Sequence, residues 1–253
     1  MLDQKLTGRA VVATLAALVT LTLPLTFPPG GGPTGVDRAL ADMVRTDPPA
    51  AIHRVLVAPS DGWLVVTLLL AAIAWFGWRR QWWRAATMLV VPEAAIALNT
   101  WVLKPLFDRP LHDYLAYPSG HTVHLVAVVT TVVLLCDSAR VRLAVAVAGV
   151  VACGAVVVGQ VGMDYHYATD VVGGAAAALA LGIAGCAAAE RLAGSRRPAR
   201  GPGHDASVPR TGRGQRHRRS RPRSGVSSAG TRWRRAASPR AASPPARPSP
   251  RRA

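Results

Sequence analysis

The sequence predicts an all-α integral membrane protein, a bundle of six helices followed by a disordered, basic C-terminal tail. Long uncharged apolar runs fill residues 10–190, and a helix of about 20 apolar residues crosses the hydrocarbon core of a membrane. Most of the charged residues lie outside these apolar runs, and the net positive charge lies at the C-terminal end. Residues 194–253 hold 17 arginines and one acid, whereas the remainder holds 13 Lys and Arg against 12 Asp and Glu. This separation excludes a compact soluble domain, and three cysteines without a C-x-x-C pair exclude a disulfide scaffold.

Six apolar segments are the predicted membrane spans. They cover residues 10–27, 63–78, 85–103, 120–136, 143–161 and 171–189. The first span follows Lys5 and Arg9, so it is either a signal peptide or an uncleaved anchor. No clear small-x-small cleavage site follows it, which favours the anchor. Segment 36–45 is either a short interfacial helix or a solvated loop.

The loop charges predict the orientation. One set of alternate segments holds eight Lys or Arg: Lys5, Arg9, Arg79, Arg80, Arg84, Arg140, Arg142 and Arg191. The opposite set holds five: Arg38, Arg45, Arg54, Lys104 and Arg109. Because cytoplasmic loops carry the excess of positive charge, both termini are predicted to be cytoplasmic. The loops over residues 104–120 and 162–170 then face outward.

The chain divides into three predicted parts. Residues 1–62 form an anchor span and an external loop, residues 63–192 form the core of the bundle, and residues 193–253 form the tail. The tail has too few apolar residues to offset the entropy of ordering, so we expect it to be disordered. It either contacts anionic lipid or is compositional drift, since 28 arginines accompany only two lysines. Nonspecific nucleic-acid binding is an alternative for the tail, and no specific nucleic-acid partner is predicted.

Three polar clusters fall on the predicted outer face, where charges next to the membrane indicate a site. They are Lys104-Pro-Leu-Phe-Asp-Arg109-Pro110, Pro118-Ser119-Gly120-His121 and His166-Tyr-Ala-Thr-Asp170. Lys and Arg suit phosphate oxygens, and the N–H groups of a helix beginning at Ser119-Gly120 favour an anion. A carboxylate on one imidazole nitrogen, as the spacing of His166 and Asp170 allows, makes the other nitrogen a better base or nucleophile. Together these groups suit phosphoryl transfer.

The motifs resemble the type 2 phosphatidic acid phosphatase superfamily, which also contains the vanadium haloperoxidases. The resemblance covers about residues 60–190 and is most specific at Pro-Ser-Gly-His, followed by His166-x-x-x-Asp170. It implies that His166 attacks phosphorus and forms a phosphohistidine, that Asp170 orients it, and that His121 protonates the leaving oxygen. It also implies that Lys104, Ser119 and Gly120 hold the phosphate, without metal or cofactor.

Two departures from the family pattern concern arginines. The position seven residues after Lys104 is Leu111 rather than Arg, although Arg109 is a candidate stand-in. The position six residues before His166 is Gln160 rather than Arg. Each lost contact to an anion costs about 1.5–3 kcal/mol. The resemblance therefore implies a divergent membrane phosphatase acting on a polyprenyl or phosphatidate-type lipid phosphate at the outer face, or a degenerate relative that binds lipid phosphate or a partner protein without turnover.

Other interpretations of the polar residues stay open. The histidines and Asp170 could form a metal site, although no second carboxylate or known ligand spacing supports it. A haloperoxidase would require vanadate. His124 is either a partner of the site or a hydrogen-bonded histidine of the bundle. Glu93, next to Pro92 in the third span, is either a hydrogen-bonded bundle residue or a proton relay or headgroup contact.

Overall fold

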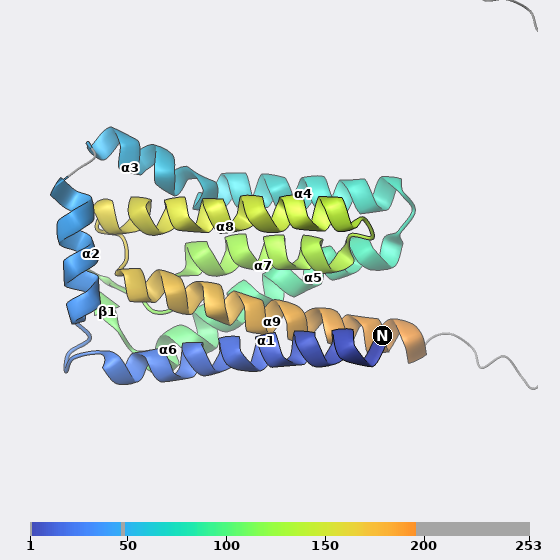
Figure 1. The fold of residues 1–253 in the computed structure, drawn as a ribbon, viewed down its shortest axis with the longest axis horizontal. Helices are drawn as coiled ribbons and strands as arrows, with labels where there is room; N and C mark the ends of the chain where they lie inside the picture. Colours follow the sequence, from blue (N-terminus) through green and yellow to red (C-terminus); the bar gives the residue numbers. More distant parts are fainter. Residues whose placement is uncertain (1, 47–48, 196–253) are drawn as a thin grey trace, which may run out of the picture. The chain divides into compact units, whose positions relative to one another are not determined.

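The computed structural model describes residues 2–46 and 49–195, and Figure 1 traces long helices that run side by side. The helices are α1 (Leu2–Thr22), α2 (Gly35–Thr46), α3 (Ala50–Val57), α4 (Gly62–Trp78), α5 (Trp82–Leu98), α6 (Lys104–Phe107), α7 (Gly120–Leu135), α8 (Ala139–Gly162) and α9 (Ala168–Ser195). Short turns are η1 (Leu23–Thr26), η2 (Ala58–Ser60) and the π-helical η3 (Asn99–Leu103). Strands β1 (Pro110–Leu111) and β2 (Tyr114–Leu115) form an antiparallel hairpin. The predicted all-α class is confirmed.

The predicted spans correspond to helices in the described part of the chain. Five helical stretches are long and apolar enough to cross a membrane: Thr7–Thr26, Ala50–Trp78, Trp82–Phe107, Ala139–Gly162 and Ala168–Ser195. The remaining predicted span is α7, a shorter apolar helix of 16 residues. The chain is therefore a multi-pass membrane protein. The predicted tail lies, from residue 196 onward, outside the described residues.

The segment between the first two spans contains more helix than the sequence predicted. Segment 36–45 is helical and belongs to α2, whereas α3 was not predicted. The start of α2 is a capping box, because Thr34 and Asp37 each accept a hydrogen bond from the backbone N–H of the other. A capping box satisfies two N–H groups that a helix start otherwise leaves unpaired. This exchange explains why α2 begins at Gly35.

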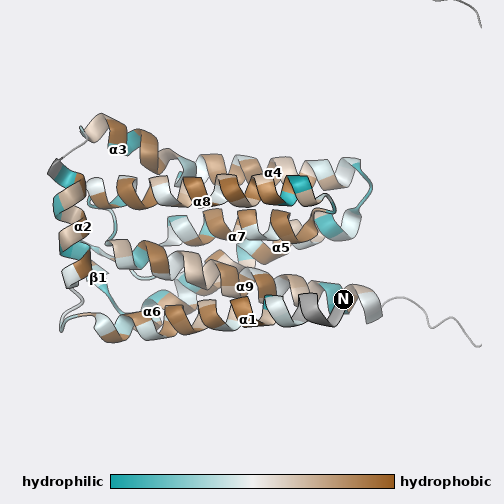
Figure 2. Ribbon diagram, in the orientation of Figure 1, coloured by the Kyte–Doolittle hydropathy of each residue, from teal (hydrophilic) through white to brown (hydrophobic). Residues whose placement is uncertain are grey.

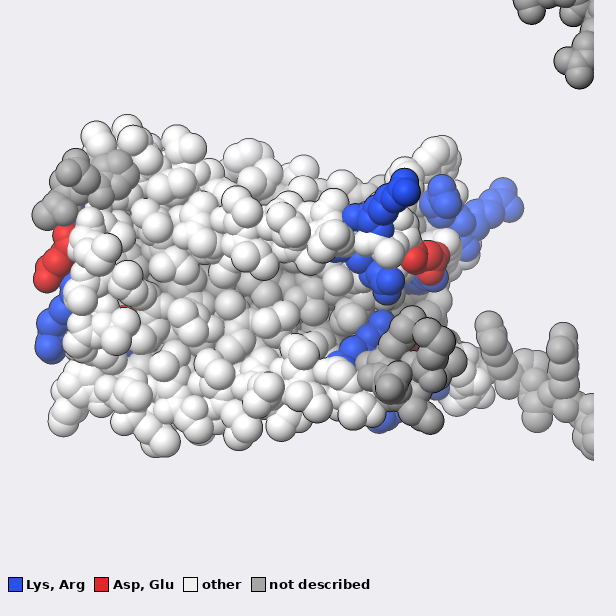
Figure 3. All heavy atoms as spheres, viewed as in Figure 1, with Lys and Arg blue, Asp and Glu red and all other residues white. Residues whose placement is uncertain are grey.

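Charged side chains gather at the ends of the bundle. Figure 2 shows apolar residues along the lengths of the long helices, and Figure 3 shows Lys and Arg concentrated on this face where α1 begins and α9 ends. Arg79 and Arg80 lie in the connection between α4 and α5, and Arg84, Arg140 and Arg142 lie in the first turns of α5 and α8. Between the two ends this face is uncharged, as a surface in contact with lipid tails requires.

Helix α7 lies at the centre of the packing and contacts α4, α5, α8 and α9. Against α9 it presents Val123 and Ala127, which are buried beside Ala177 and Ala178. Small side chains allow two helix backbones to approach closely, which is how helices associate in a membrane. The start of α7 and the start of α9 are therefore held next to each other, and both carry predicted site residues.

Gly173 in α9 allows the starts of the two helices to lie this close together. A Cβ atom on Gly173 would lie 2.1 Å from the ring of Tyr117, far inside van der Waals contact. The ring cannot move aside, because its hydroxyl donates a hydrogen bond to the Thr20 carbonyl at 2.6 Å and Phe27 and Phe107 each pack edge-on at 5.1 Å. Only glycine lets α9 approach the segment that leads into α7.

We expect Gly173→Ala to lower the free energy of unfolding by about 1–3 kcal/mol, the usual cost of overpacking. Gly154→Ala in α8 is the matched control, because its Cβ would meet nothing within 4 Å and alanine favours helix. Denaturant unfolding in detergent measures both. Equal stability of the two variants would contradict the packing account.

Candidate active site

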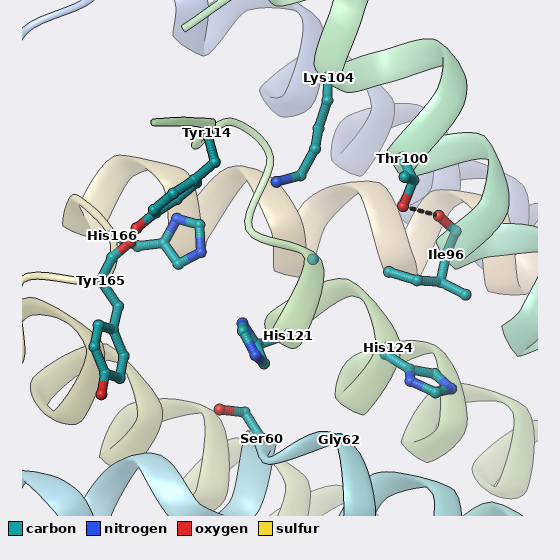
Figure 4. Close-up of a pocket in the computed structure, with 11 residues that line it drawn as sticks. Ser60, Gly62, Ile96, Thr100, Lys104, Tyr114, His121, His124, Tyr165 and His166 are labelled. Atoms are coloured by element: carbon teal, nitrogen blue, oxygen red, sulfur yellow. Dashed lines mark hydrogen bonds between the residues drawn. The ribbon is translucent and has the colours of Figure 1, made fainter. Parts of the chain in front are cut away.

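A cavity of about 710 Å³ opens near the ends of several helices. It is lined by Ser60, Gly62, Ile96, Thr100, Lys104, Tyr114, Gly120, His121, His124, Tyr165 and His166. Each of the three polar clusters that the sequence singled out contributes to this lining, through Lys104, His121 and His166. Figure 4 shows these three side chains around one open space, although they come from α6, α7 and the loop before α9.

The two histidines face each other across the cavity. The ring centroids of His121 and His166 are 6.3 Å apart, and the ring planes are inclined by 71°. His121 lies in the first turn of α7, whereas His166 precedes the first residue of α9 by two positions. Both rings line the same cavity, so a group bound in it would be within reach of both. The arrangement suits a transfer in which one imidazole attacks and the other donates a proton.

Asp170 lies next to His166 but does not line the cavity. Its Oδ2 atom lies 3.7 Å from His166 Nδ1, a nitrogen that is buried and makes no hydrogen bond in the described structure. The same oxygen accepts a 3.0 Å hydrogen bond from the N–H of Tyr167, so the carboxylate caps the start of α9. Because His166 precedes α9, the contact joins the loop to the first turn of the helix.

Lys104 brings positive charge to the cavity. Of the described residues that line it, Lys104 is the one Lys or Arg. Its ammonium donates to the Leu115 carbonyl and lies 5.9 Å from the centre of the Tyr114 ring. The π-helical turn Asn99–Leu103 comes directly before it, and such turns are frequent at functional sites.

Of the two predicted phosphate ligands at the start of α7, one lines the cavity and the other does not. Gly120 lines the cavity, where the unpaired N–H groups of the first helical turn lie. Ser119 is completely buried and does not line it. Its N–H donates to the Asp170 carbonyl at 3.0 Å, and its hydroxyl donates to Gln160 Oε1 at 3.0 Å. Ser119 thus fastens α7 to α9 and α8, and its donors point away from the cavity.

Arg109 does not reach the cavity, although the sequence predicted a phosphate ligand there. It is 1% exposed, and all five of its N–H donors serve acceptors of the protein. Nε donates to Gly31 O at 3.0 Å, Nη1 to Thr169 Oγ1 and Asp170 Oδ1 at 2.7 Å each, and Nη2 to Gly32 O at 2.9 Å and Asp37 Oδ2 at 3.2 Å. No donor is left for a phosphate, and the residue instead holds Asp170.

The two positions where the resemblance led us to expect arginine, residues 160 and 111, are also structural here. Gln160 is completely buried and donates to the Ser60 hydroxyl at 3.3 Å, while it accepts from Ser119. Leu111 is buried in the hairpin. Neither residue lines the cavity. The cavity therefore relies on Lys104, the histidines and helix N–H groups for contacts to an anion.

Several residues of the site were not predicted from the sequence. Ser60, Thr100, Tyr114 and Tyr165 line the cavity but belong to no motif. Burial and the charges of Asp170 and Asp164 raise the pKa of Tyr114, so it stays protonated and its hydroxyl donates to the Tyr165 carbonyl. The tyrosine next to the hairpin turn was the available signal, but nothing in the sequence places it near His166.

Glu93 and His124 pair with each other. His124 Nε2 lies 3.1 Å from Glu93 Oε1, and His124 lines the cavity while Glu93 does not. This contact is the hydrogen-bonded bundle pair that the sequence left as one alternative. Among the described residues, no group of three or more His, Cys, Asp or Glu side chains is placed to hold a metal ion.

Asp37 is a buried carboxylate that the sequence did not single out as part of a site. Burial raises its pKa, but hydrogen bonds from Thr169 and Thr34 outweigh this effect and hold the pKa below its usual range. Asp37 is therefore ionised at neutral pH and forms a charged cluster with Arg109 and Asp170. Its capping box with Thr34 is the sequence signal that marks it, though only as a helix start.

The structure is thus a multi-pass membrane protein in which His121 and His166 line one cavity. Residues 99–192 match the family model described as the PAP2 superfamily, the family that the motifs resemble. A solved structure titled as the first transmembrane PAP2 type phosphatidylglycerolphosphate phosphatase from Bacillus subtilis has the same fold. It is 22% identical with a TM-score of 0.58, over 71% of this chain and 96% of that chain. No curated protein matches the chain.

We expect Arg109→Gln to lower the free energy of unfolding by about 3–5 kcal/mol, because it leaves two buried carboxylates without their cation. Arg45→Gln is the matched control. Its ion pair with Asp164 is about half exposed, so its loss should cost at most about 1 kcal/mol. Denaturant unfolding of both variants in detergent tests this. A loss of stability no larger than that of Arg45→Gln would contradict the structural role that we assign to Arg109.

Proposed function

We propose that the chain is an integral membrane phosphatase that hydrolyses a phosphomonoester or diphosphate of a lipid. The observation that carries this proposal is the pair of imidazoles, His121 and His166, 6.3 Å apart across one cavity. The match of residues 99–192 to the PAP2 superfamily model supports it, as does the fold shared with a membrane phosphatase of a lipid phosphate.

In the first step, His166 acts as the nucleophile. Its Nδ1 faces Asp170, so Nε2 is the nitrogen that attacks phosphorus. The N–P bond forms while the bond between phosphorus and the lipid oxygen breaks. His121, on the opposite side of the cavity, donates a proton to that oxygen, and the lipid alcohol or phosphate leaves. Asp170 stabilises the charge that the His166 ring acquires.

In the second step, water hydrolyses the phosphohistidine. His121 is now neutral and accepts a proton from the water, whose oxygen attacks phosphorus while the N–P bond breaks. Inorganic phosphate leaves, and both rings return to their first state. Lys104 and the N–H groups at Gly120 hold the phosphate oxygens through both steps. The residues supply every proton and charge, so the proposed reaction needs no metal or cofactor.

The site should lie at the outer face of the cell membrane, with both termini in the cytoplasm. The excess of positive charge in the opposite loops supports this orientation. A polyprenyl or phosphatidate-type lipid would present its headgroup at that depth. We assign residues 1–62 to an anchor and external segment, residues 63–192 to the phosphatase core, and residues 193–253 to an accessory tail that could contact anionic lipid.

The direct test is release of phosphate from polyprenyl diphosphate and phosphatidate by the detergent-purified protein. We expect His166→Ala to lower the rate by about 10³-fold or more, because the nucleophile is lost. His112→Ala, an exposed histidine that does not line the cavity, should retain the activity. Equal rates for the wild type and His166→Ala would exclude the proposed nucleophile.

A second candidate is a protein that binds a lipid phosphate or a partner protein without turnover. The observation that favours it is the engagement of Arg109 and Gln160 inside the protein, which leaves Lys104 as the one Lys or Arg among the described cavity residues. Phosphate-free wild type that retains a radiolabelled lipid phosphate intact would support this candidate over an enzyme.

A further inference from the structure

We propose that Asp37, on α2, is a positioning residue for the reacting histidine. It acts through Arg109 and Thr169, which hold the Asp170 carboxylate toward the His166 ring. The proposal rests on the proposed function in so far as His166 is the reacting group. It gives a role in the chemistry to the N-terminal segment, because α2 lies outside residues 99–192, which match the family.

Asp37 contacts the first turn of α9 directly. The side chain is buried, and its Oδ1 accepts the N–H of Thr169 at 2.9 Å while Oδ2 accepts the Thr169 hydroxyl at 2.9 Å. Thr169 is the residue next to Asp170. A negative charge at the start of a helix is stabilised by the helix dipole and by its unpaired N–H groups. Asp37 therefore fixes the backbone that carries Asp170.

Asp37 also shares the guanidinium of Arg109 with Asp170. Arg109 uses one N–H of Nη2 for Asp37 and one N–H of Nη1 for Asp170, so it cannot close a two-pronged pair on Asp170. Asp170 Oδ1 takes this bond, which leaves Oδ2 to face His166 Nδ1. The guanidinium carbon also lies over the Phe27 ring and over the Tyr167 ring, 3.7 and 4.5 Å from their centres.

The net charge of the buried cluster also supports a role for Asp37 in the chemistry of His166. Asp37, Arg109 and Asp170 are buried together and carry a net charge of −1 when both acids are ionised. That charge favours the cationic ring that His166 becomes when Nε2 bonds to phosphorus. Replacing Asp37 by an amide would make the cluster neutral. Arg109 would then pair with Asp170 alone, and the Asp170 carboxylate would be drawn away from His166.

A purely structural role for Asp37 makes a different prediction. Its capping box with Thr34 would by itself account for the helix start of α2. Thr34→Val removes both hydrogen bonds of the Thr34 hydroxyl, but it keeps the backbone N–H of residue 34 on Asp37 and leaves the carboxylate on Arg109 and Thr169. Thr34→Val and Asp37→Asn should therefore separate the two roles. Both lower stability, but only Asp37→Asn should change the reactivity of His166.

The experiment measures carbethoxylation of each histidine by diethyl pyrocarbonate, with peptide mass spectrometry of the full-length protein in detergent. The rate at His166 is divided by the rate at exposed His112 in the same molecules, with both rates taken on the alkaline plateau where the rate no longer depends on pH. We expect Asp37→Asn to lower this ratio by about tenfold, the size of effect that a misplaced reacting group produces. Thr34→Val should stay within about twofold of the wild type.

Two further measurements keep the outcomes distinct. If Asp37→Asn does not fold, Thr169→Val removes the hydroxyl that joins Asp37 to Arg109 while keeping both charges, and a fall of about threefold or more in the ratio is expected. An unchanged ratio in the folded variant overturns the proposal. Absence of phosphate release from the wild type would instead overturn the proposed function, since the reactivity of His166 is measured without a lipid substrate.

Discussion

The guanidinium of Arg109 joins its own loop to two parts of the chain that are distant from it in sequence, residues 31–37 and the start of α9. Its acceptors come from the loop at Gly31 and Gly32, from α2 at Asp37, and from α9 at Thr169 and Asp170. A buried arginine is tolerated only when every donor is matched, and here each one is. Gly31, with φ of +74° and a Cβ position 2.7 Å from Pro110, lets the backbone pass close enough to accept. The position of Asp170, and through it of His166, follows from this arrangement.

The site differs from the family pattern in where its positive charge lies. Arg109 pairs with two buried carboxylates, one of which lies next to His166, whereas Lys104 lines the cavity. A phosphate in the cavity would meet one ammonium, helix N–H groups and two imidazoles. Such a site has less charge to offset the dehydration of an anion than one with two further arginines. We therefore expect weaker phosphate binding, with the reaction depending more on the histidine pair.

The sequence predicted the spans and the convergence of residues, and missed the contacts between them. Apolar length identified the six helices because the bilayer fixes that length. The order of Lys104, His121 and His166 placed three clusters on one face, and all three line one cavity. The role of Arg109 could not be predicted, because the sequence gives its charge but not the acceptors to which its guanidinium donates. Asp37 was missed for the same reason: its partners lie more than 70 residues away.

The most direct test of the central claim is to isolate the enzyme intermediate. The protein is mixed with a lipid phosphate labelled at the transferred phosphorus, quenched in base, digested, and the label is mapped by mass spectrometry. The account predicts a phosphoryl group on the peptide that contains His166, stable to base and lost in acid. Label on another residue, or turnover of substrate without any labelled peptide on rapid quenching, would contradict it.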